Sequence, residues 1–169
     1  MTVWTRAESP LGKLLLVGEE RGDAGRPVLS SLSMPGQRGA PSVRPTWRRD
    51  AGPFTDALTQ LSAYFSGQRR EFDLEFAETG SEFQRRIWAA LEEIPYGTTT
   101  TYGEIAAQLG VARTDLRAVG AAIGANPLLL VRPCHRVIGA DGAMRGYAGG
   151  VERKVWLLTH EGALQPTLL

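Results

Sequence analysis

Two helix-starting motifs in the second half of the chain constrain its fold more than any other feature. Ser81 and Gln84 form an S-x-x-Q pattern, and Thr101 and Glu104 form a T-x-x-E pattern. In such capping boxes the hydroxyl and the later side chain satisfy N–H groups at the helix start. Apolar residues at helical spacing follow each motif, over 83–94 and again up to residue 109. The second half of the chain is therefore predicted to be helical.

A third helix is predicted from about Thr114 to Ala125, where Asn126 and Pro127 end it. The chain turns at 110–113, between this helix and the short helix before it. A short helix, a tight turn containing glycine and a second helix form the spacing of a helix-turn-helix motif. Structural helical hairpins share that spacing, so the pattern alone leaves DNA binding and simple packing equally open.

The third predicted helix has unusually small side chains. Gly120 and Gly124 lie within it, although a glycine inside a helix costs about 0.5–1 kcal/mol relative to alanine. Alanines fill most of its other positions: Ala118, Ala121, Ala122 and Ala125. One explanation is close packing against a neighbouring helix. The other is close approach to a nucleic-acid backbone or groove, with Arg117 in the first turn contacting phosphates or bases.

The first third of the chain is predicted to be rich in strands. Short apolar runs bounded by glycine and proline predict strands within 12–22 and 27–34. Residues 35–53 are rich in glycine and proline and predict an exposed loop. A helix is expected over 54–65, stopped by Gly67, and alternation over 70–76 predicts a half-buried strand.

Composition excludes several classes of protein. Of the 169 residues, 43% are hydrophobic and 22% charged, which is ordinary for a globular protein. The net charge of +1 gives no whole-chain argument for nucleic acid or a membrane. However, residues 113–145 hold five arginines, including Arg145, and only two aspartates. This local excess of positive charge favours an anionic partner. The N-terminus does not resemble a signal peptide, and no apolar run is long enough to span a membrane.

Cys134 is the only cysteine, in the segment "VRPCHRVIG". One cysteine excludes an intramolecular disulfide and a multi-thiolate metal site, and it fits a reducing compartment. A lone cysteine is most often a buried core residue. Here His135 follows directly and could take the thiol proton, while Arg132 and Arg136 would favour the thiolate. A buried strand is predicted over 128–131, and Pro133 would present the thiol at its end.

One geometric objection accompanies the Cys134–His135 pair. Neighbouring side chains on an extended chain point to opposite faces. The two groups can therefore communicate only through a bend in the chain or a bridging water.

The segment "PCHRVIGADGAMRGYAGG" resembles the O6-alkylguanine-DNA alkyltransferases, also called methylated-DNA–protein-cysteine methyltransferases. "FQRRIW", "IPYGTTTTYGEIA", "RAVG", "NP" and "LLTHEG" extend the resemblance over 81–169, and "ESPLGKLLLVG" and "LSAYFSGQRREFDL" carry it more loosely into the first half. It implies an α+β protein. A ribonuclease-H-like α/β scaffold domain over 1–80 would precede a mostly helical, winged helix-turn-helix-like domain over 81–169 that binds DNA and holds the active site.

The resemblance implies that the partner is double-stranded DNA containing O6-alkylguanine. Family members bind the minor groove and flip the damaged nucleotide into a pocket, which costs a few kcal/mol of unstacking. Arg117 would fill the vacated space in the stack, and Tyr102 would crowd the 3′ phosphate. Ala118 and Gly124 would lie on the DNA-facing helix. The chain is expected to be a cytoplasmic monomer, associated with the nucleoid if bacterial, with no membrane partner; cooperativity on DNA stays open.

The resemblance also assigns the chemistry. Cys134 would accept the alkyl group irreversibly, so that each molecule reacts once. His135 would take the thiol proton through a water, and Glu161 would hold His135. Asn126 would tie the helix to the active-site loop, and Tyr147 would donate to the purine N3. The guanine pocket would be lined by Pro133, Val137, Ala148 and Gly149. No cofactor and no metal are expected.

The chain departs from the family pattern at several points. Arg132 stands where Val or Ile is usual, and we hypothesise that it lowers the thiol pKa or contacts DNA. The turn before Arg117 is one residue longer than usual. Ala148 offers no side-chain hydrogen bond to O6, which could shift the preference for the alkyl group.

Three other functions are alternatives to alkyl transfer. Non-enzymatic lesion-binding relatives lack the acceptor cysteine, which Cys134 argues against. A cysteine hydrolase needs an oxyanion hole, for which the sequence has no loop signature. A transcription regulator of this family needs a further N-terminal domain with a metal-bound cysteine.

Overall fold

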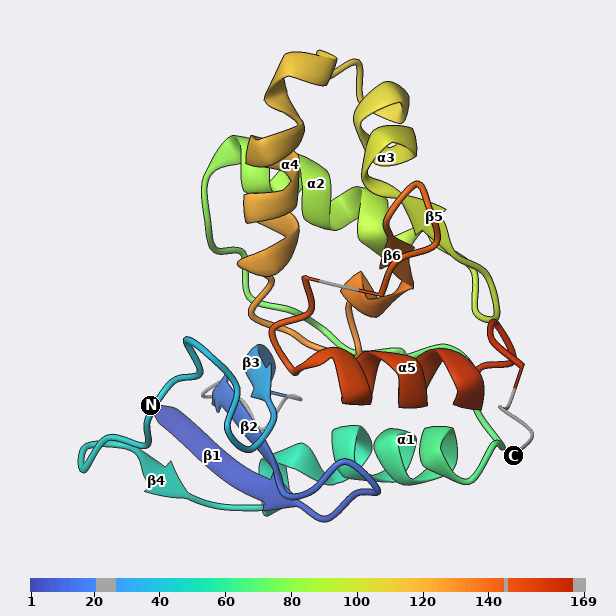
Figure 1. The fold of residues 1–169 in the computed structure, drawn as a ribbon. Helices are drawn as coiled ribbons and strands as arrows, with labels where there is room; N and C mark the ends of the chain where they lie inside the picture. Colours follow the sequence, from blue (N-terminus) through green and yellow to red (C-terminus); the bar gives the residue numbers. More distant parts are fainter. Residues whose placement is uncertain (21–26, 145, 166–169) are drawn as a thin grey trace. The chain divides into compact units, whose positions relative to one another are not determined.

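The computed structural model describes residues 1–20, 27–144 and 146–165 (Figure 1). The chain divides into two compact units, Met1–Glu78 and Thr79–Leu169, which we call the N-terminal and C-terminal units. The sequence-based boundary lay between residues 80 and 81. Arg145 and the end of the strand predicted within 12–22 lie outside the described residues.

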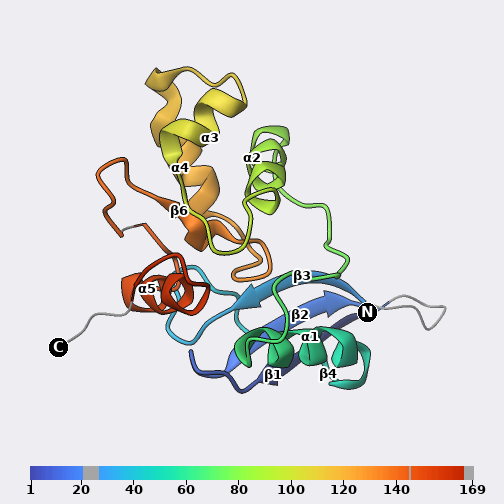
Figure 2. The ribbon, with the colours of Figure 1, turned by 90° about the vertical axis from the view of Figure 1, so that its right-hand side faces the viewer.

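The N-terminal unit is built on a four-stranded sheet in the order β3-β2-β1-β4. Its strands are β1 (Thr2–Ala7), β2 (Leu14–Glu19), β3 (Val28–Ser33) and β4 (Arg48–Arg49). β2 pairs antiparallel with both β1 and β3, whereas β4 pairs parallel with β1. The short helix η1 (Gly52–Phe54) leads into α1 (Thr55–Phe65), which runs beside the sheet (Figures 1 and 2). Buried strand residues form the core with Phe54, Leu61 and Tyr64.

The strands predicted within 12–22 and 27–34 and the helix predicted over 54–65 are confirmed by β2, β3 and α1. The sequence did not predict β1, and β4 lies within the loop expected over 35–53. The strand predicted over 70–76 is wrong, because these residues make only one isolated bridge, Leu29 with Phe76. Side-chain exposure alternates there as expected. However, the Gln60 side chain bonds both backbone groups of Asp73, at 2.8 and 3.0 Å, in place of a strand partner.

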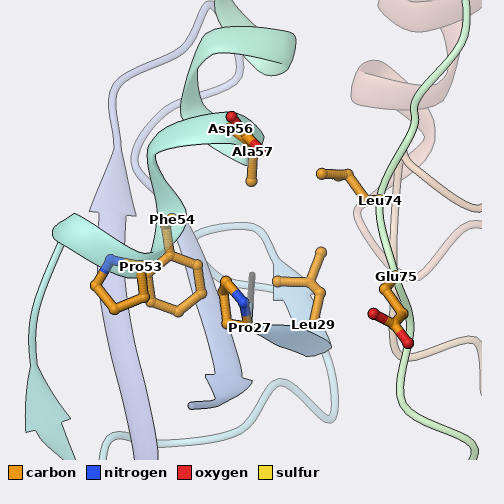
Figure 3. Close-up of a pocket in the computed structure, with 8 residues that line it drawn as sticks. All are labelled: Pro27, Leu29, Pro53, Phe54, Asp56, Ala57, Leu74 and Glu75. Carbon is orange, nitrogen blue, oxygen red and sulfur yellow. The ribbon is translucent and has the colours of Figure 1, made fainter. Parts of the chain in front are cut away.

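A small apolar cavity separates α1 from β3 in the N-terminal unit (Figure 3). Its volume of about 20 Å³ is enough for one water. It is lined by Pro27, Leu29, Pro53, Phe54, Asp56, Ala57, Leu74 and Glu75. A space of this size is a packing gap in the core rather than a ligand site.

The C-terminal unit is mostly helical, with α2 (Glu82–Glu92), α3 (Tyr102–Gln108), η2 (Arg113–Asp115), α4 (Leu116–Gly124), η3 (Cys134–Arg136) and α5 (Val151–His160). A two-residue parallel sheet joins β5 (Thr100–Thr101) to β6 (Val137–Ile138). α4 packs against both α2 and α3, so the three predicted helices form one cluster (Figure 1). No helix within the described ranges is long and apolar enough to cross a membrane.

The helix starts follow the predicted capping. At α2 the box is complete, since Gln84 N donates to Ser81 Oγ at 3.1 Å and Ser81 N donates to Gln84 Oε1 at 2.9 Å. At α3 Thr101 Oγ1 accepts from Glu104 N at 3.1 Å, whereas the Glu104 carboxylate accepts from Thr100 Oγ1 at 2.9 Å. The second motif therefore caps α3 through the Thr101 hydroxyl alone, and the Glu104 side chain instead contacts Thr100 in β5.

The strand predicted over 128–131 is wrong, although all four side chains are buried. Val131 N donates to Leu129 O at 2.8 Å, and Leu130 between them has a φ of 73°. Cys134 N donates to Arg132 O at 2.8 Å around Pro133, whose φ of −80° and ψ of 63° define an inverse γ-turn. A positive φ is unfavourable for leucine, and strain of this kind is typical of functional loops. Cys134 therefore begins η3 instead of ending a strand.

Candidate active site

Cys134 is buried, with 5% of its surface exposed. Burial raises the pKa of the thiol from 9.0 to about 11, although a hydrogen bond from Asn126 and the charges of Lys154 and Arg132 oppose that rise. Arg132 therefore lowers the thiol pKa, as its position in the sequence predicts, but desolvation outweighs its influence in the resting protein. At neutral pH the cysteine is held as a neutral thiol.

His135 and Glu161 form a buried pair, with Nε2 of His135 2.9 Å from Oε2 of Glu161. Burial lowers the pKa of His135, so the imidazole is neutral at neutral pH. Burial alone would raise the pKa of Glu161, but hydrogen bonds from His135 and Arg136 bring it down to about 2. A carboxylate only accepts hydrogen bonds, so the proton of the neutral ring must be on Nε2. Nδ1 therefore carries the lone pair.

That lone pair is available to accept a proton. His135 Nδ1 is buried and has no hydrogen-bond partner among the residues that the structure describes. His135 directly follows Cys134 on the 3₁₀ helix η3, where the chain is no longer extended. The objection from strand geometry thus disappears, since successive side chains on such a helix are about 120° apart. The site offers a neutral base beside a neutral thiol.

Arg136 holds the carboxylate of this pair. Its Nε and Nη2 donate to the two oxygens of Glu161 at 2.8 and 3.0 Å, and its Nη1 donates to Ile94 O at 2.7 Å. A bidentate guanidinium fixes both the position and the charge of a carboxylate. Sequence reasoning missed this role, because nothing in the spacing predicts that the Arg136 and Glu161 side chains meet.

Lys154 is a second functional residue that sequence reasoning missed. It lies on α5 and is only 1% exposed, with Nζ donating to Val137 O at 2.6 Å. Burial lowers its pKa to about 8, against the opposing influence of Cys134. Its place on the apolar face with Leu157 and Leu158 could have indicated a buried lysine. Its cation would stabilise a thiolate at Cys134.

Asn126 joins the end of α4 to the segment before Cys134. Its Oδ1 accepts from Leu128 N at 3.0 Å, and its Nδ2 donates to Arg132 O at 2.9 Å. Both contacts are buried, so the amide substitutes for missing backbone partners in an irregular segment. This is the geometry expected for a residue that ties the helix to the active-site loop.

Tyr147 is buried at the same site. Its ring centroid lies 6.3 Å from that of His135, in an edge-on arrangement. Burial raises its pKa well above the ordinary value, so the hydroxyl keeps its proton. Within the described ranges that hydroxyl has no hydrogen-bond partner, which leaves it able to donate. The other predicted pocket residues are buried or half-buried: Pro133, Val137, Ala148 and Gly149.

The residues predicted to contact DNA lie on the surface of the helical cluster. Arg117, Ala118 and Gly124 are exposed on α4. A Cβ added at Gly120 or Gly124 would meet nothing within 4 Å, so helix packing does not explain these glycines. Tyr102 begins α3, and its hydroxyl would lie 2.9 Å from a Cβ added at Gly146, just before Tyr147. The small face of α4 is therefore open.

Comparison with known proteins decides the family. Residues 82–163 match the DNA-binding domain of 6-O-methylguanine DNA methyltransferase, and residues 2–77 match its ribonuclease-like domain. The chain belongs to the 6-O-methylguanine DNA methyltransferase family. This confirms the predicted α+β architecture of a ribonuclease-like domain followed by a helical DNA-binding domain.

Members of this methyltransferase family match over nearly the whole chain. A methylated-DNA–protein-cysteine methyltransferase of Mycolicibacterium paratuberculosis is 48% identical over 100% of this chain and 98% of its own length. A protein of the same name from Methanosarcina acetivorans is 44% identical, over 92% of this chain and 96% of its own. The structure of Mycobacterium tuberculosis OGT in complex with DNA matches with a TM-score of 0.85 and 47% identity, over 94% of this chain and 92% of that one.

Glu161 predicts how the stability of the methyltransferase depends on pH. Its folded pKa of about 2 lies below the ordinary 4.5, so its contribution is complete above pH 4.5 and is lost as the pH falls towards 2. The shift corresponds to about 3 kcal/mol of unfolding free energy. Denaturant unfolding measured from pH 6 to 2 should show this loss. In Glu161→Gln the curve should flatten below pH 4.5, whereas the exposed Glu152→Gln should behave as wild type.

Proposed function

We propose that this protein repairs DNA by direct reversal, transferring the alkyl group of O6-alkylguanine in duplex DNA irreversibly to Cys134. The single observation that carries the proposal is the buried Glu161–His135 pair, which leaves the Nδ1 lone pair without a partner among the described residues, in the residue next to the protein's only cysteine. A buried thiol with a raised pKa is inert until a base takes its proton, and this pair provides the base.

The transfer can be written with each atom accounted for. A water passes the proton of Cys134 Sγ to His135 Nδ1, and Glu161 stabilises the imidazolium that forms. The thiolate attacks the alkyl carbon in line with the bond to O6. A C–S bond forms, the C–O bond breaks, and its electron pair goes to the guanine. Tyr147 donates to N3 of the purine and stabilises the negative charge as it develops.

The product explains why each molecule acts once. The bond formed at Cys134 is a thioether. Water does not hydrolyse a thioether, so the thiol is not restored. Pro133, Val137, Ala148 and Gly149 would surround the guanine. Ala148 contributes only a methyl group, so contacts to O6 would come from the backbone.

Duplex DNA is the proposed partner, bound through its minor groove by α4. The open face of that helix allows the close approach that a groove requires, and Arg117 in its first turn would enter the stack in place of the flipped nucleotide. Tyr102 at the start of α3 would crowd the 3′ phosphate. We expect a monomer to be the active species.

A charge placed on this face tests the DNA contact. Ala118 is exposed, so Ala118→Glu should leave stability within about 0.5 kcal/mol of wild type. It should weaken binding to duplex DNA by at least about tenfold, because a carboxylate would lie against phosphates. Ser62→Glu places the same charge at an exposed position of α1 and is the matched control. Equal affinities of the two variants by fluorescence anisotropy would contradict binding through α4.

The stoichiometry of repair tests the proposed reaction. A duplex with one O6-methylguanine is titrated with protein, and the nucleosides are quantified after digestion. Restored guanine should plateau at one lesion per protein molecule, even on long incubation. A yield above one would indicate a turnover enzyme such as a hydrolase. Tight binding with all of the O6-methylguanine retained would indicate a lesion-binding protein.

A further inference from the structure

Arg132 is a charged side chain buried beside the acceptor cysteine. Only 8% of its side chain is exposed. Its guanidinium lies over the Trp88 ring, 5.1 Å from the centroid, and its Nε is 3.9 Å from Oε2 of Glu92. Both partners belong to α2, so the side chain of residue 132 attaches its segment to that helix. A guanidinium over an indole is a favourable cation–π arrangement, and more so where water is excluded.

Trp88 is itself held in place. Its indole Nε1 donates to Ala122 O in α4 at 2.8 Å. Its ring also lies against Gly80, where an added Cβ would come within 2.8 Å of it. Arg132 therefore contacts a ring that is fixed to the helix proposed to bind DNA, rather than a mobile surface side chain.

The backbone of Arg132 contacts the acceptor site. Its carbonyl oxygen accepts from Asn126 Nδ2 at 2.9 Å and from Cys134 N at 2.8 Å. One residue thus connects three parts of the machinery: α2 through its side chain, Asn126 and Cys134 through its carbonyl. A shift of the Arg132 side chain would move this carbonyl, which orients both Asn126 and Cys134.

We propose that Arg132 is a positioning residue for alkyl transfer: its side chain anchors the acceptor segment to α2 by lying over Trp88, and its cation, which Glu92 partly offsets, belongs to the residue two positions before Cys134. The inference rests on the proposed role of Cys134 as alkyl acceptor. The burial of the side chain against α2 argues for this role over a direct contact with DNA.

The proposal predicts the direction in which the charge of Arg132 changes the pKa of the Cys134 thiol. Cys134 is faced by the cations of Arg132 and Lys154 and by the neutral Asn126 and Tyr147, and it is followed in the chain by His135 with its partner Glu161, while Arg132 is faced by Glu92. Arg132 favours the thiolate, and the Glu92 carboxylate partly offsets that influence. Removing the cation should raise the thiol pKa. Removing the carboxylate should lower it.

Two variants and two readouts test the proposal. Arg132→Met keeps an unbranched side chain of similar length on Trp88 without the charge, and Glu92→Gln keeps the shape of a half-exposed side chain. Carbamidomethylation of Cys134 by iodoacetamide, in which the thiolate displaces iodide, is followed by mass spectrometry from pH 6 to 10 and measures the thiolate without DNA. We expect the profile to move up by about half a pH unit in Arg132→Met and down by a similar amount in Glu92→Gln.

Single-turnover repair at saturating O6-methylguanine duplex gives the second readout. At neutral pH Arg132→Met should react about threefold more slowly than wild type and Glu92→Gln should not be slower, because the thiolate fraction follows the pKa. A purely structural clamp would slow both variants and leave both iodoacetamide profiles unshifted, which would overturn the proposal. If Arg132→Met does not fold, an unshifted profile in Glu92→Gln is sufficient to overturn it.

The iodoacetamide arm is independent of the proposed function. Shifts of opposite sign without any methyl transfer from DNA would support the role of Arg132 at the thiol and contradict the proposed repair reaction. Methyl transfer with unshifted profiles would support repair and contradict the role of Arg132.

Discussion

The Cys134→Ser variant is expected to accept no alkyl group from O6-methylguanine duplex while binding that duplex as wild type does. A serine hydroxyl is a far weaker nucleophile than a thiolate, and its pKa lies far above that of a thiol, so much less of the anion forms at neutral pH. The side chains are nearly isosteric, and Cys134 packs in a buried position, so the fold should be retained.

Binding and transfer are measured separately for this variant. Anisotropy gives the affinity for the duplex, and nucleoside analysis after prolonged incubation gives the amount of guanine restored. Any restored guanine above the level of a no-protein control would place the acceptor at another residue. If the variant lost both binding and transfer, Cys134 would contribute to the fold and not to the reaction alone.

Glu161→Gln is expected to slow alkyl transfer by about 10²–10⁴-fold and to destabilise the protein by about 3–5 kcal/mol at neutral pH. The carboxylate now accepts from His135 Nε2 and from two nitrogens of Arg136. An amide can instead donate to Nε2, which would put the imidazole proton on Nδ1 and remove the base. It would also leave the Arg136 guanidinium buried without its counter-charge.

The two effects of Glu161→Gln can be distinguished. Stability is measured by denaturant unfolding, and the rate of transfer is measured under conditions where the variant is folded. Glu152→Gln, on the exposed first turn of the same helix, is the control for both. A Glu161→Gln protein that is destabilised but transfers at the wild-type rate would show that the pair holds the fold and does not act on the thiol proton.

Local sequence signals predicted the helical cluster well. Hydroxyl caps at Ser81 and Thr101 act within a few residues, so their pattern is legible in the chain itself. The small side chains of α4 fit either close packing or an open face, and the empty space around Gly120 and Gly124 excludes packing at these two positions.

Predictions failed where tertiary contacts override local patterns. The alternation over 70–76 and the apolar run over 128–131 predict strands, but Gln60 satisfies the backbone at Asp73, and γ-turns bend the chain before Cys134. The sequence shows the influence of Arg132 on the thiol pKa but not the larger, opposite effect of desolvation, because adjacent arginines are visible in a sequence and burial is not. The contacts of Arg136 with Glu161 depend on side chains far apart in the chain.

Alkyl transfer to Cys134 is tested most directly by the mass of the intact protein after incubation with duplex containing O6-methylguanine. We expect a single added methyl group, located on Cys134 by tandem mass spectrometry of the peptide that contains it. A methyl group mapped to any other residue, or an unchanged protein mass alongside restored guanine, would contradict it.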